Sequence, residues 1–192
     1  MIRALHEGLG IPADVLLREV QSEDKCDETV ALDRFPLKEM VKRGWLRATE
    51  NDLRNNVEGL LARFFEPLGG VSFIPRLCRR TLVERSGKSM DEYAIWAWTA
   101  RVISRAQELH LPVYEPNMVD RSFVKHVTQL SFSDRGPLEA QKYLAQHGIG
   151  LIVEPHLPKT HLDGAALLSQ EQRPIIGLSI RHDRIDNFWF TL

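Results

Sequence analysis

The chain has 192 residues, of which 43% are apolar and 27% are charged, and its formal net charge is −1. These values are ordinary for a globular protein and exclude a disordered or fibrous chain. A net charge near zero gives no general field that would hold a nucleic-acid backbone or an anionic membrane.

Cysteine usage and the lack of long apolar runs predict a cytoplasmic protein without a membrane partner. Cys26 and Cys78 are the only cysteines, and neither belongs to a CxxC or Cys/His pattern, which favours a reducing compartment. The N-terminus lacks the basic start and apolar core of a signal peptide. No segment approaches the ~18 consecutive apolar residues of a membrane span.

The first third of the chain predicts short helices separated by a linker. Residues 2–8 fit a helix, and a second helix starts with Pro12 in "IPADVLL". The polar stretch "QSEDKCDET", residues 21–29, is the expected linker. In "FPLKEMVKRGWL", Pro36 marks a helix start and Gly44 a helix end.

The middle of the chain predicts three longer helices. Thr49 or Asn51 can cap a single helix over "DLRNNVEGLLARFFEPLG". The longest helix is expected to open with a capping box of Ser89 and Glu92, and another helix fits residues 120–130. Trp96 lies off the apolar face of the longest helix, so it is either an exposed contact or part of a broader buried face. That apolar face consists of Ile95, Trp98, Val102, Ala106 and Leu109.

After residue 133 the pattern changes from helices to helices and strands. Residues 137–147 fit a helix, "IGLIVEP" a strand, and "GAALLSQEQRPIIGLSI" two strands joined by a polar turn at residues 170–172. The final "RHDRIDNFWFTL" opens a helix, with Asp183 or Asp186 as its N-cap. Phe188, Trp189 and Leu192 should pack inward onto the strands or else form a patch that drives self-association. The expected fold class is α+β, mostly α.

Three candidate sites can be weighed from residue types and spacing. "SGKS", residues 86–89, fails as a phosphate-binding loop because Leu82 stands where that loop requires a glycine. His156, His161 and Asp163 resemble a metal cluster, but Pro158 breaks the helix that could bring them together, so a surface loop is expected. A basic run either contacts an anion or acidic partner or is a solvated loop, and it contains Arg76, Arg79, Arg80 and Arg85. We identify no catalytic constellation.

Three stretches together resemble one family architecture. They are "MIRALHEGLGIPADVLL", "FPLKEMVKRGWL", and "GLIVEPHLPKTHLDGAALL" continued by "RPIIGLSIRHDRIDNFWFTL". The first is similar to the last helices of a HigA-type helix-turn-helix repressor of the XRE family. The last is similar to the opening half of an ImmA/IrrE-type metallopeptidase domain. The resemblance implies a helix-turn-helix remnant and linker over 1–32, a helical connector over 33–133, and the N-terminal half of a zincin-like peptidase domain with a small sheet over 134–192.

The resemblance also implies what the chain does. Proteins with this architecture are transcriptional regulators, often antitoxin-like, and the helix at "DRIDNFWFTL" continues in them into a zinc-binding His-Glu-x-x-His motif. The chain ends before that motif, so no family metal ligand or catalytic residue can be assigned, and zinc is expected only in an extended form. We expect a truncated regulator that is neither a peptidase nor a sequence-specific DNA binder.

Two alternatives remain open. The chain can be a non-catalytic interaction module that binds a toxin or another regulator through its helical middle and basic run. It can also catalyse through a site that has no sequence signature.

Overall fold

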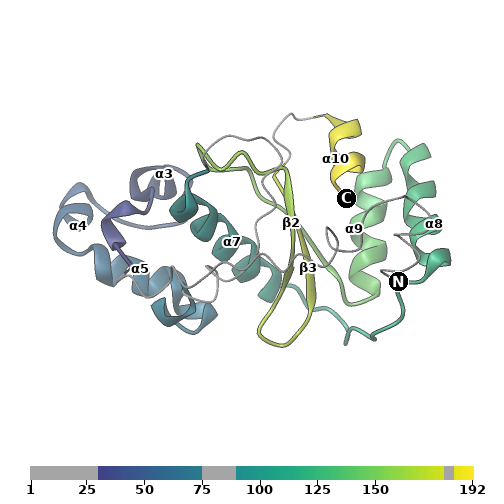
Figure 1. Cartoon of the computed structure of the whole chain (residues 1–192), viewed down its shortest axis with the longest axis horizontal. Coiled ribbons are helices and arrows are strands. Elements are labelled where there is room, and N and C mark those ends of the chain that lie inside the picture. Colours follow the sequence, from purple (N-terminus) through teal and green to yellow (C-terminus); the bar gives the residue numbers. More distant parts are fainter. Residues whose placement is uncertain (1–29, 75–89, 180–183) are drawn as a thin grey trace, which may run out of the picture.

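The computed structural model describes residues 30–74, 90–179 and 184–192, and this part of the chain is an α+β fold (Figure 1). The helices dominate, and they accompany one three-stranded sheet. The helices predicted over 2–8 and from Pro12, and the linker over 21–29, lie outside the described residues.

Short helices form the first described region, and α3 begins and ends as the sequence predicts. Pro36 precedes α3, and Gly44 follows it with a positive φ of 71°. The Gly44 and Trp45 amides donate to the carbonyls of Val41 and Met40, both at 2.9 Å, which closes the helix end in a Schellman motif. The elements here are η1 (Leu32–Arg34), α3 (Leu37–Lys42), α4 (Glu50–Asn55), α5 (Val57–Phe65), η2 (Glu66–Leu68) and η3 (Val71–Phe73).

The prediction of one continuous helix after Thr49 is wrong, because the chain breaks at Asn56. Thr49 caps α4, and its hydroxyl accepts from the Asp52 amide while the Asp52 carboxylate accepts from the Thr49 amide. Asn56 has φ −139° and ψ 39°, outside the helical range. Asparagine has a low helix propensity, which favours a break at this position. The apolar face of α5 buries Leu60, Leu61 and Phe65.

Helix α7 (Glu92–Gln107) is the longest described helix and is buried on most sides. Asp91 caps it, accepting from the Ala94 amide at 3.2 Å. The predicted capping box is therefore wrong, since Glu92 is the first helical residue and cannot occupy the third position. Trp96 is only 8% exposed, which confirms the broader buried face.

Two further helices lie where the sequence predicts them. Helix α8 (Arg121–Gln129) is capped by Asp120, whose carboxylate accepts from the Phe123 amide at 2.7 Å, and η4 (Leu130–Phe132) follows. Helix α9 (Gly136–Gln146) has Pro137 in its first turn and Gly148, with φ 74°, beyond its end.

The three strands β1 (Gly150–Val153), β2 (Gly164–Leu168) and β3 (Pro174–Leu178) also occur where the sequence predicts them. Their order in the sheet is β1-β3-β2, with β3 parallel to β1 and antiparallel to β2. The β2–β3 turn contains Gln172 at φ 59°. The central strand is therefore the last of the described strands along the chain.

Helices cover both faces of the sheet, with α7 on one side and α9 and α10 on the other (Figure 1). Ile152, Leu167 and Ile175 belong to the core shared with α7, while Leu151 and Leu178 belong to the core shared with α9 and α10. Alternate residues of the strands thus enter opposite cores, which explains why β1 and β3 are apolar throughout. A Cβ atom at Gly177 would lie 2.8 Å from Trp98 Cη2, so only glycine allows α7 to approach β3 this closely.

Helix α10 (Ile185–Thr191) confirms the predicted inward packing of the C-terminal segment. Phe188 is 5% exposed within the α9 core, and Trp189 and Leu192 pack against the same core as half-buried residues. Arg184 occupies the N-cap position, so the prediction for Asp186 is wrong, and Asp183 lies outside the described residues.

Candidate functional site

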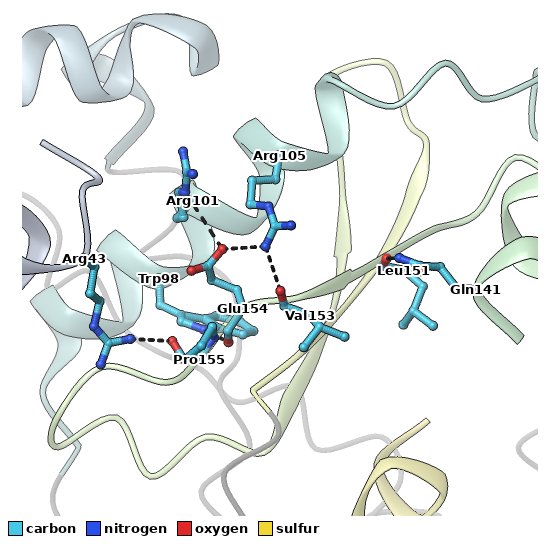
Figure 2. Close-up of polar contacts among 9 residues, drawn as sticks. All are labelled: Arg43, Trp98, Arg101, Arg105, Gln141, Leu151, Val153, Glu154 and Pro155. Atoms are coloured by element: carbon cyan, nitrogen blue, oxygen red, sulfur yellow. Dashed lines mark hydrogen bonds and ion pairs between the residues drawn. The ribbon is translucent and has the colours of Figure 1, made fainter. Parts of the chain in front are cut away.

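In the described part of the chain, several long-range polar contacts gather where strand β1 ends against helix α7 (Figure 2). The Glu154 side chain follows the apolar strand and is only 8% exposed. Arg105 Nη1 lies 2.8 Å from Glu154 Oε2, and Arg101 Nε lies 3.9 Å from the same oxygen. A buried carboxylate requires such cationic partners because burial removes its hydration.

The two arginines stand one helical turn apart on α7, and Arg105 points its Nη1 atom at Glu154, whereas Arg101 faces Glu154 only with its Nε atom (Figure 2). Their side chains are 31% and 39% exposed, so solvent reaches part of each guanidinium. The Nε atom of Arg101 is buried and has no hydrogen-bond partner. The pairing is therefore tight at Arg105 and loose at Arg101.

The backbone that follows β1 is also held by side chains from helices distant in the sequence. The buried Trp98 Nε1 donates to the Glu154 carbonyl at 2.8 Å. From α3 and its C-cap, Arg43 donates to the carbonyls of Pro155 and His156, both at 2.8 Å, and to Glu39 Oε1 at 2.9 Å. Helices α3 and α7 thereby fix the path of the chain as it leaves the sheet.

Side-chain donors close the outer edge of β1. Gln141 on α9 donates to the Leu151 carbonyl at 3.1 Å, and Arg105 donates to the Val153 carbonyl at 2.7 Å. These carbonyls point away from β3, where an unpaired strand edge would otherwise accept another chain. The arrangement at the end of β1 can order the fold, but it places no nucleophile beside a base.

The histidine segment between β1 and β2 lies as a loop in the structure. The His156 carbonyl accepts from Arg43, and His161 has a positive φ of 47°. Asp163 accepts through its carbonyl from the Ser179 amide at 2.8 Å, and its Oδ1 atom is buried without a hydrogen-bond partner. Within residues 30–74, 90–179 and 184–192, no three His, Cys, Asp or Glu side chains form a group that could hold a metal ion.

The side chains of the described residues therefore do not fit a zinc ion. The absence of stoichiometric zinc from the purified chain stays a prediction.

The basic run and the "SGKS" stretch cannot be placed. Both lie outside the described residues, and the basic run comprises Arg76, Arg79, Arg80 and Arg85. Their role as anion or partner contacts stays a prediction.

The solvent side of α10 is a second surface of interest. Arg184 Nη2 lies 2.6 Å from Asp186 Oδ2 in an exposed ion pair. These two residues line an open hollow together with Asn187 and Phe190. Phe190 is 84% exposed, directly beside the half-buried Trp189.

Sequence reasoning missed the contacts at Glu154. The available signals are a charged residue directly after the apolar run "GLIV", and two arginines four positions apart on a helix rich in apolar residues. Neither signal identifies the partner, since Arg105 and Glu154 are 49 positions apart.

Comparison of the chain with models of known protein families, with curated proteins and with solved structures gave no match. No helix in the described part of the chain is long and apolar enough to cross a membrane.

Proposed function

We propose that the chain is part of a HigA-like transcriptional regulator and that residues 134–192 are the N-terminal half of an ImmA/IrrE-type metallopeptidase domain. The observation that supports this proposal is the order α9, β1, β2, β3, α10 within residues 134–192, of which β1 to α10 lie in the segment that carries the resemblance. The resemblance implies that the last of these helices leads into the zinc motif. A helix held against the sheet core by the buried Phe188 is a suitable support for such a motif.

The 192-residue chain itself has neither peptidase activity nor zinc under this proposal. Its sequence contains no His-Glu-x-x-His. Hydrolytic zinc sites need about three converging protein ligands and an open position. The nearest histidines to one another in the second half of the chain, His156 and His161, lie in the loop after β1 without a third ligand among the described residues.

Metal analysis of two proteins tests the proposal. The 192-residue form should contain no stoichiometric zinc, whereas a form extended through the following stretch of the gene should bind zinc, because α10 would then present two histidines on one face. Tight zinc binding by the 192-residue form would contradict the proposal that the zinc ligands lie beyond residue 192. An extended form that contains the motif but binds no zinc would contradict a functional peptidase site.

The nucleotide sequence after codon 192 is an independent test of the family. The proposal predicts a His-Glu-x-x-His within the next few codons. A reading frame that lacks this motif would contradict the peptidase-domain assignment, whatever the metal content of the protein.

DNA binding by this chain should be weak, salt-sensitive and without sequence preference. The resemblance at residues 1–17 covers only helices that follow a recognition helix, and the net charge of −1 adds no general attraction. A titration at physiological salt checks this, and nanomolar binding to one sequence would contradict it.

A non-catalytic interaction module that binds a toxin or another regulator is the second candidate function. The exposed aromatic rings of Phe132 and Phe190, 91% and 84% exposed, favour it. Light scattering of the purified protein distinguishes self-association from a monomer that exposes these rings. A stop codon soon after codon 192 without the zinc motif would favour this function over the first.

A further inference from the structure

No further inference is drawn: the strongest candidate, the exposed apolar side chains of Phe132, Leu138, Ile185 and Phe190 on η4, α9 and α10, could receive a partner protein or a second copy of the chain, and nothing in the structure shows what covers them.

Discussion

Arg105 makes two contacts at the end of β1, one to the backbone and one to a buried side chain. One Nη1 atom donates both to the Val153 carbonyl and to the Glu154 carboxylate, and the alternative partner Arg101 is 3.9 Å away. Removing Arg105 therefore takes a donor from the carbonyl of the half-buried Val153 and leaves the buried Glu154 carboxylate weakly compensated.

We expect Arg105→Met to lower the free energy of unfolding by about 2 kcal/mol, measured by urea denaturation. Arg173→Met is the matched control, because Arg173 is 37% exposed, close to the 39% of Arg105, and pairs with Glu171, which is 70% exposed. That variant should stay within about 0.5 kcal/mol of the parent. Equal losses in the two variants would show that the contact with Glu154 adds no stability.

At the scale of single residues, Asp52 also makes a contact whose stabilising effect depends on pH. The Thr49 amide, and after it the Thr49 hydroxyl, donate to the Asp52 carboxylate and hold its pKa below the ordinary value of 3.8. Because the pKa is lower in the folded state, the contact stabilises the fold above pH 3.8 and is lost as the pH falls through the folded-state pKa.

We expect Asp52→Asn to be less stable than the parent at neutral pH and the two proteins to converge in acid. Thermal unfolding of both proteins between pH 7 and pH 2 measures the difference. A difference that is constant over this range would mean that ionisation of Asp52 does not contribute.

At the scale of elements, α10 is a short helix that packs against the rest of the molecule through one face. Phe188 is buried in the core of Leu144, Leu151 and Leu178, while Phe190 points to solvent. The same substitution can therefore be made at both phenylalanines, which lie two positions apart on one helix and differ mainly in their burial.

Phe188→Ala should cost about 3 kcal/mol of stability, since it leaves a cavity in the core. Phe190→Ala should change stability by about 0.5 kcal/mol or less. Chemical denaturation of both variants provides the measurement. If Phe190→Ala were the more damaging change, the orientation of α10 would be wrong.

Local signals explain which elements the sequence predicts well. Pro36 and Gly44 bound α3, and Gly148 ends α9, because proline and glycine restrict or permit particular backbone angles wherever they stand. The break at Asn56 and the start of α7 at Glu92 depend on small differences between neighbouring capping residues, which are below what a single sequence resolves.

The candidate site could not be predicted in the same way. The partners of Glu154 come from α7, and the partner of the Pro155 carbonyl is Arg43, which is 112 positions away. Such pairs form only after the sheet and helices have packed, so no local pattern records them. The burial of Trp96 has the same origin, because the ring of Phe35, which is distant in the sequence, packs against it.

At the scale of the molecule, the helical region and the sheet share one core. Trp98 and Val102 on α7 lie in the same cluster as Ile152, Leu167 and Ile175 on the strands. The tip of the β2–β3 hairpin also reaches the helical region, where Gln170 donates to the Leu68 carbonyl. The helical region before the boundary predicted at residue 133 and the sheet after it are thus in continuous apolar contact.

A fragment of residues 134–192 should therefore not fold alone. It would expose the sheet face that α7 covers, and ~60 residues bury too little surface to offset this loss. Circular dichroism and amide dispersion in NMR spectra of the fragment, compared with the full chain, are the measurements. Cooperative unfolding of the isolated fragment would instead establish residues 134–192 as an independent domain.

The position of β3 between β1 and β2 sets the order of events while the chain is being synthesised. β1 and β2 are made first, yet neither pairs with the other, and each pairs only with β3. At about 5–20 residues per second, the ribosome needs roughly one to five seconds between the end of β1 and the end of β3. During this interval the side of α7 that faces the sheet in the folded chain, including Trp98 and Val102, has no strand to pack against.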